Sequence, residues 1–164
     1  MTTALVRTRT ATLDDLEPVV AMHARCSPTT LRRRFHVPVP EVHPRLVRRL
    51  IEPPRGWSVV AEQCGQVIGL GCAGALSGTE LEVGLLVEDA HQGTGVGSRM
   101  LRDLAREARL RGYRTLVCLA EADNESVLPT VRRAGLIGIA TVVDGLLEIV
   151  VPLPVRRRGL LRPA

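Results

Sequence analysis

The 164-residue sequence predicts one α/β domain in which seven strands are interrupted by helices. Two observations predict it. Short apolar runs bounded by glycine turns recur through the chain, and strands and amphipathic helices alternate in its second half. We expect the domain to span residues 1–154 and the arginine-rich residues 155–164 to form a disordered tail.

The first third of the chain is expected to hold one strand and short helices. Residues 4–9 alternate like a strand, and Thr12 with Asp15 approximates a capping box that starts a helix. Two more helices are expected over residues 28–34 and 41–51, each ended by prolines.

Three strands should follow. Residues 57–62 and 66–76 flank Cys64 and Gly65, which predicts a hairpin with a tight turn. Residues 81–87 are apolar at every second position and form the next strand. The glycine inside it, Gly84, should mark a bulge or a close approach by another backbone or a ligand.

The second half alternates helices and strands. Pro129 should interrupt the second of its helices, Gly135 should cap that helix, and Asp144 with Gly145 is a strong hairpin signal. The predicted elements are helix 98–112, strand 115–120, helix 124–134, and strands 136–143 and 146–153.

Composition limits the function classes. Residues are 45% hydrophobic but only 2% aromatic, so stacking on nucleic-acid bases is nearly unavailable. The net charge of +5 is concentrated at the two ends, which leaves open nucleic-acid or acidic-protein contacts as well as a bias of genomic composition. Four scattered cysteines form no metal or redox motif, and we see no membrane span or signal peptide. A cytoplasmic protein without a metal is expected.

A glycine-rich stretch, residues 92–97, joins the strand 81–87 to the amphipathic helix. Uncovered amides that lead into a helix N-terminus attract anions, usually phosphate. The P-loop pattern fails because all 22 basic residues are arginine, and the dinucleotide fingerprint fails because Ser98 stands at the third glycine's place. The pattern that fits is Q-x-x-G-x-G, at Gln92, Gly95 and Gly97.

In this context the motif resembles the pyrophosphate loop of the GNAT (Gcn5-related) N-acetyltransferases, which bind acetyl-coenzyme A. Asn124 followed by residues 134–136 resembles a weaker motif of that family, and the element order matches over nearly the whole chain. The resemblance implies a mixed, mostly antiparallel sheet of about seven strands with helices on both faces. It implies acetyl-CoA as co-substrate, bound by Leu85, Leu86, Val87, Gln92, Gly93, Thr94, Gly95, Val96, Gly97, Ser98, Asn124 and Ser126.

Acetyl transfer to an amine needs a base, because a lysine-like ammonium has a pKa near 10.4. Glu82, ten residues before the loop glutamine, is the first candidate by its resemblance to bacterial protein-lysine acetyltransferases, although an alternating strand also places it in water. Glu80 and then Glu121 are the next candidates for the base. Many family members protonate the leaving thiolate with a tyrosine, and here Val131 occupies that position. Water, Ser126 or Cys118 could take the place of the tyrosine, although Ser126 and Cys118 also fit a small polar and a buried core position.

The acceptor is the least constrained part of the function. Residues 27–35, SPTTLRRRF, resemble a helix of bacterial protein-lysine acetyltransferases, so we expect a protein lysine first and a small amine second. His23, His36 and His43 lie in the same region. A non-catalytic acetyl-CoA-binding regulatory module remains an alternative, and the sequence leaves open whether the protein forms a homodimer.

Overall fold

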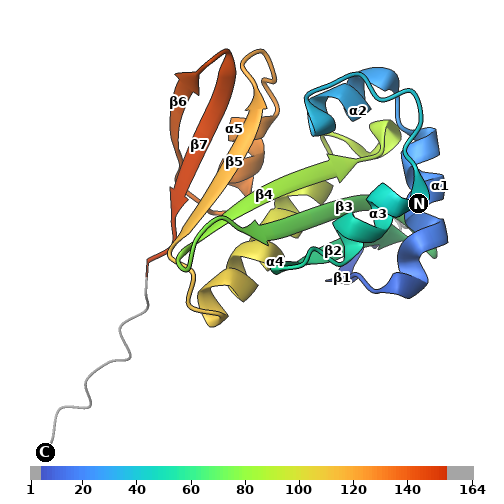
Figure 1. Cartoon of the computed structure of the whole chain (residues 1–164), viewed down its shortest axis with the longest axis horizontal. Helices are drawn as coiled ribbons and strands as arrows, with labels where there is room; N and C mark the ends of the chain where they lie inside the picture. The colour runs from blue at the N-terminus through green and yellow to red at the C-terminus, as the bar shows by residue number, and fades with distance from the viewer. Residues whose placement is uncertain (1–4, 155–164) are drawn as a thin grey trace, which may run out of the picture.

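A seven-stranded sheet forms the centre of the protein (Figure 1). The computed structural model describes residues 5–154. The sheet order is β1-β2-β3-β4-β5-β7-β6, and every pairing is antiparallel except β4 with β5. The strands are β1 Arg7–Thr10, β2 Gly56–Gln63, β3 Gln66–Ala75, β4 Glu80–Val87, β5 Thr115–Glu121, β6 Ile139–Val143 and β7 Leu146–Pro152. The predicted mixed sheet is confirmed.

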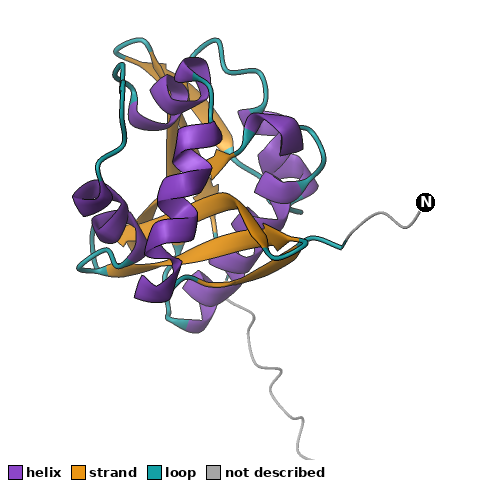
Figure 2. Ribbon diagram, turned by 90° about the vertical axis from the view of Figure 1, so that its right-hand side faces the viewer, coloured by secondary structure: helices purple, strands orange, loops and turns teal. Residues whose placement is uncertain are grey.

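Helices cover both faces of the sheet, as predicted (Figure 2). One face carries the first three α-helices, and the other carries the last two, each over its own apolar core. The α-helices are α1 Leu16–Arg25, α2 Pro28–Phe35, α3 Pro44–Ile51, α4 Val96–Leu110 and α5 Val127–Arg133, with short 3-10 turns at Leu13–Asp15 and Asp89–His91. No helix within residues 5–154 combines the length and hydropathy that a membrane crossing needs.

Alternation along β4 decides which core each side chain joins. Leu81 and Val83 are buried under α4, whereas Leu86 is buried under α1 and α2. Glu82 and Gly84 share the face of Leu86, because side chains two apart in a strand point the same way. The residues of β4 therefore divide between the two layers.

The predicted hairpin turns are confirmed by the backbone. Cys64 and Gly65 have φ of 51° and 76°, and Asp144 and Gly145 have φ of 50° and 80°. Two successive positive φ angles are typical of the type I′ turn, whose twist matches that of paired strands.

Several predicted boundaries were wrong by a few residues. α3 begins at Pro44 rather than at residue 41, with His43 as its cap. α5 begins at Val127 rather than at residue 124, so Pro129 is its third residue, where a backbone donor has no helical partner to lose. β6 begins later than predicted because Leu136 donates to Val131 O (3.2 Å) and closes the helix after Gly135. The predicted tail lies outside the described residues.

Asp15 anchors the start of the domain. Its carboxylate accepts hydrogen bonds from Arg9 Nη2 (2.6 Å), Arg9 Nη1 (2.8 Å) and Thr12 N (2.8 Å), and the residue is buried. The hydrogen bond from Arg9 is the main reason that the pKa of Asp15 lies below its usual value. The carboxylate form therefore stabilises the fold.

We expect Asp15→Asn to lower the free energy of unfolding by about 1–3 kcal/mol at pH 7. A carboxyl whose pKa is depressed by folding stabilises the protein above its unfolded-state pKa, and this stabilisation disappears as the pH falls through the folded-state pKa. The difference between wild type and variant should therefore shrink below about pH 4. Urea unfolding across pH measures it, and the exposed neighbour Asp14→Asn should change little.

Candidate functional site

Strands β4 and β5 separate along their length (Figure 1). A cavity lies between them. The two strands pair only at Glu80 with Thr115, Leu81 with Leu116 and Glu82 with Val117. Beyond Glu82 the strands diverge, and the space between them is lined by both strands, by α2 and α5, and by the loop before α4. Strand separation thus exposes backbone in the middle of a sheet.

Two backbone amides of β4 face this gap. In an antiparallel pair, hydrogen-bonded and non-hydrogen-bonded positions alternate. Glu88 N donates to Ile68 O (2.9 Å), and the same register pairs Leu86 with Leu70. The backbone N–H and C=O groups of the even-numbered residues of β4 therefore point toward β3. The N–H groups of Leu85 and Val87 therefore point away from β3, into the cavity.

The glycine loop presents further free amides. Gly93 and Gly95 have φ of 73° and 93°, and α4 begins directly afterwards. The first amides of α4, those of Val96, Gly97 and Ser98, have no partner within the helix. Nothing lies within 4 Å of the place where a Cβ would stand on Gly93 or Gly95. An anion can therefore reach these donors at the positive end of the helix dipole.

Side chains of the loop are occupied by the protein itself. Gln92 Nε2 donates to Val87 O and to Thr30 Oγ1, both at 3.0 Å. Thr94 donates to His91 O (2.6 Å), and the buried Ser98 donates to Thr130 O (3.1 Å). What the loop offers a ligand is mainly its backbone.

Asp89 is a residue that sequence reasoning missed. It accepts hydrogen bonds from Ser27 N (2.9 Å), Ser27 Oγ (2.6 Å) and Thr30 Oγ1 (2.9 Å). Burial acts to raise the pKa of Asp89, but the hydrogen bonds from Ser27 and Thr30 outweigh it and hold the pKa below its usual value. Because Gln92 also contacts Thr30, this network ties the N-terminus of α2 to the glycine loop.

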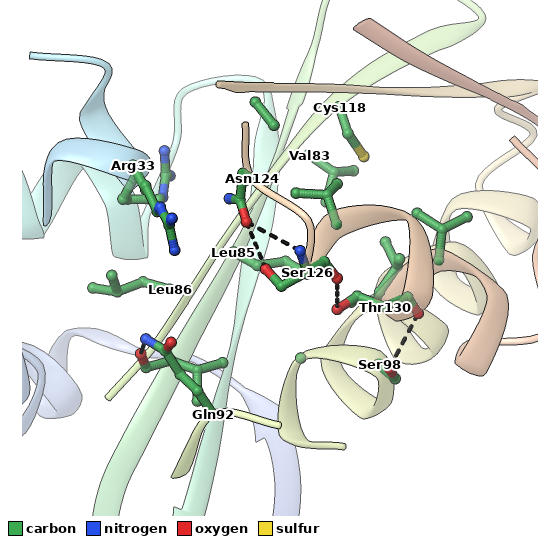
Figure 3. A pocket seen from close by; sticks show the side chains of 18 of the residues that line it. Arg33, Val83, Leu85, Leu86, Gln92, Ser98, Cys118, Asn124, Ser126 and Thr130 are labelled. Carbon is green, nitrogen blue, oxygen red and sulfur yellow. Dashed lines mark hydrogen bonds between the residues drawn. The ribbon is translucent and has the colours of Figure 1, made fainter. Parts of the chain in front are cut away.

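The start of α5 forms the opposite wall of the cavity (Figure 3). Asn124 Oδ1 accepts hydrogen bonds from Ser126 Oγ (2.7 Å) and Ser126 N (3.3 Å). Arg133 lines the cavity and donates to Gly93 O (3.4 Å). Arg99, in the first turn of α4, donates instead to Val6 O (2.8 Å), toward β1. Arg133 is therefore the arginine that lies beside the loop.

Glu82 lies on the cavity wall, is exposed, and is the last residue of β4 that pairs with β5. The reserve candidates differ from it. Glu80 accepts a hydrogen bond from Ser77 Oγ (3.3 Å) and does not line the cavity, and Glu121 forms an ion pair with Arg32 of α2 (3.2 Å).

The cavity wall carries no phenol. Val131 is 2% exposed and lines the cavity, while the single tyrosine, Tyr113, packs against Trp57 with ring centroids 6.1 Å apart. Cys118 also lines the cavity, but burial, and secondarily Glu82, raises the pKa of its thiol to about 12. Cys118 is therefore a poor proton donor at neutral pH.

Of the three histidines near α2, only His36 lines this cavity. His23 belongs to α1, its buried ring has Nδ1 2.8 Å from Val19 O, and burial lowers its pKa. His43 accepts a hydrogen bond from Arg45 N (3.1 Å). No group of three potential metal-binding side chains occurs among residues 5–154.

Comparison with known proteins identifies the family. Residues 19–136 match the acetyltransferase (GNAT) family. The chain belongs to this family. Among solved structures, the GNAT domain of S. lividans PAT is 27% identical, with a TM-score of 0.81 and 90% of each chain covered. A search among curated proteins found no significant match.

Two more distant GNAT structures share the fold. A putative acetyltransferase from Salmonella typhimurium, determined with its cofactor acetyl-CoA, is 22% identical, with a TM-score of 0.67 and coverage of 94% and 96%. The ribosomal-protein-S18-alanine N-acetyltransferase from Escherichia coli is 16% identical, with a TM-score of 0.67 and coverage of 95% and 99%. The gap between β4 and β5 is thus set in a GNAT acetyltransferase fold.

Proposed function

We propose that this GNAT protein transfers the acetyl group of acetyl-CoA directly to an amine, and that a protein lysine is the preferred acceptor. The observation that carries the proposal is the gap between β4 and β5, which places the free amides of Leu85 and Val87 beside the glycine loop. Acetyl-CoA supplies an activated thioester and an anionic pyrophosphate. The free amides in the gap suit the thioester carbonyl, and the amides of the glycine loop suit the pyrophosphate.

The residues of the chain fit the coenzyme in position and chemistry. The amides of the loop and of the first turn of α4 would bind the pyrophosphate, with Arg133 beside them. Leu85, Leu86 and Val87 would hold the pantetheine arm along β4, and the amide of Leu85 or Val87 would polarise the thioester carbonyl. Asn124 and Ser126 would close the other side.

Glu82 would accept the proton of the attacking amine, directly or through water. The new C–N bond forms at the acetyl carbon while the C–S bond breaks, and the amine loses one proton. The wall near Val131 offers no phenol to the departing sulfur, so we assign its protonation to water. Direct attack is favoured because the buried Cys118 stays protonated and is a weak nucleophile.

Preference for a protein lysine is supported by the resemblance of residues 27–35 to bacterial protein-lysine acetyltransferases and by α2 lying on the cavity. A second candidate function is an acetyl-CoA-binding regulatory module without catalysis. Val131 at the expected tyrosine position favours that alternative.

The first test is release of free thiol from acetyl-CoA with a panel of lysine peptides and small amines. We expect release that requires an acceptor and is faster with lysine peptides. Release with small amines alone would change the proposed acceptor from a protein lysine to a small amine. Coenzyme binding without release for any acceptor would establish the regulatory module.

A further inference from the structure

The three successive arginines of α2 have different partners. Arg32 pairs with Glu121 at the end of β5 (3.2 Å). Arg33 and Arg34 line the cavity, are half-buried, and make no ion pair with any residue of the described chain, 5–154. Two guanidinium groups on the cavity wall are thus left without a carboxylate.

Gly84 explains how Arg34 reaches the strand. A Cβ on Gly84 would stand 2.7–2.8 Å from the guanidinium atoms of Arg34, so the absence of a side chain lets the cation lie against β4. The sequence predicted a bulge or an approach by a backbone or a ligand at Gly84, and the group that approaches it is instead a side chain. Glu82 is the neighbouring residue on the same face of the strand. The guanidinium of Arg34 therefore lies against the strand two residues from the proposed base.

Arg33 adds an unmet donor to the same region. Its Nε is buried and has no hydrogen-bond partner among the described residues, which is costly unless a ligand supplies one. Figure 3 shows Arg33 on the α2 side of the cavity, across from Asn124 and Ser126. Glu82 is the one carboxylate among the described residues that line the cavity, whereas three arginines line it: Arg133 at the glycine loop, and Arg33 and Arg34 on the α2 side.

We propose that the acceptor carries a carboxylate close to its amine and that Arg33 and Arg34 bind this carboxylate. The inference rests on the proposed acetyl transfer and narrows its substrate to a lysine with an acidic neighbour. Guanidinium groups bind carboxylates through paired, charge-assisted hydrogen bonds, which suits the free donors of both side chains. Such a contact would orient the amine toward Glu82.

The test compares two lysine peptides that differ only in Glu or Gln beside the lysine. We expect wild type to show a kcat/KM about 10- to 100-fold higher for the Glu peptide. Arg33→Gln should bring this ratio close to one, and Arg33→Lys should keep part of it. Arg106→Gln removes an exposed arginine from α4 and should keep the full ratio. Free lysine and lysinamide form a second pair, which shows whether an α-carboxylate can replace the acidic neighbour.

Gly84→Ala tests Arg34 without changing an arginine, because the new methyl group must displace the guanidinium. It should lower the Glu-over-Gln ratio while a thermal melt shows a folded protein. Transfer to both peptides with equal kcat/KM would overturn the inference and leave the proposed function standing. A ratio that survives both Arg33→Gln and Gly84→Ala would also overturn it.

Binding separates the two proposals if no transfer occurs. The affinities of the acetylated Glu and Gln peptides for the protein with coenzyme A can be measured by fluorescence anisotropy. Tighter binding of the Glu peptide, lost in Arg33→Gln, would support the carboxylate site while acetyl transfer fails. Equal affinities, or no binding of either peptide, would overturn it.

Discussion

Glu82→Gln should lower kcat/KM for acetyl transfer by about 100- to 10,000-fold while leaving coenzyme affinity unchanged. The substitution keeps the size of the side chain but removes its ability to accept a proton. Because Glu82 lies at the point where β4 and β5 diverge, beside the amides of Leu85 and Val87, its loss should act on the chemical step. Single-turnover rates with bound acetyl-CoA measure that step.

The defect of Glu82→Gln should depend on pH. An amine with a pKa near 10.4 deprotonates by itself as the pH rises, so the variant should approach wild type at high pH. Glu80→Gln is the matched control, since Glu80 is two residues earlier on the same strand but does not line the cavity. Equal losses in both variants, or an undiminished rate in Glu82→Gln, would contradict the assignment of Glu82 as base.

Local signals in the sequence were sufficient for the order of elements. Asp144 with Gly145 and Cys64 with Gly65 have few alternatives to a tight turn, and both turns form. Pro129 was harder to place, because its effect depends on where the helix begins. A missing N–H costs nothing within the first turn of a helix. Because α5 begins at Val127, Pro129 lies in that first turn.

Contacts between distant elements could not be predicted. Asp89 and Ser27 are 62 residues apart and meet only because the end of β4 lies beside the start of α2. Arg99 and Arg133 both lie on helices near the loop, and only the rotation of each helix decides which guanidinium reaches it. For Gly84 the sequence predicted a bulge or an approach by a backbone or a ligand, whereas the packing of α2 brings a side chain, that of Arg34, against it.

Gly95→Val should weaken the binding of acetyl-CoA by at least about 100-fold, which corresponds to roughly 3 kcal/mol. Gly95 has a φ of 93°, and the space around the position of its missing Cβ is empty. A valine would fill the space through which phosphate oxygens approach the amides of α4, and it would strain the backbone. Calorimetric titration with acetyl-CoA measures the loss.

Backbone strain alone must be separated from loss of the anion site. Gly65 has a φ of 76° and an equally empty Cβ position, but it lies in the turn between β2 and β3, outside the cavity. Gly65→Val and Gly95→Val should therefore destabilise the fold to a similar extent, by about 1–3 kcal/mol. Only Gly95→Val should impair coenzyme binding. If both variants bind acetyl-CoA like wild type, the pyrophosphate lies elsewhere. If both lose binding equally, the loss arises from general destabilisation, because Gly65 has no route to the ligand.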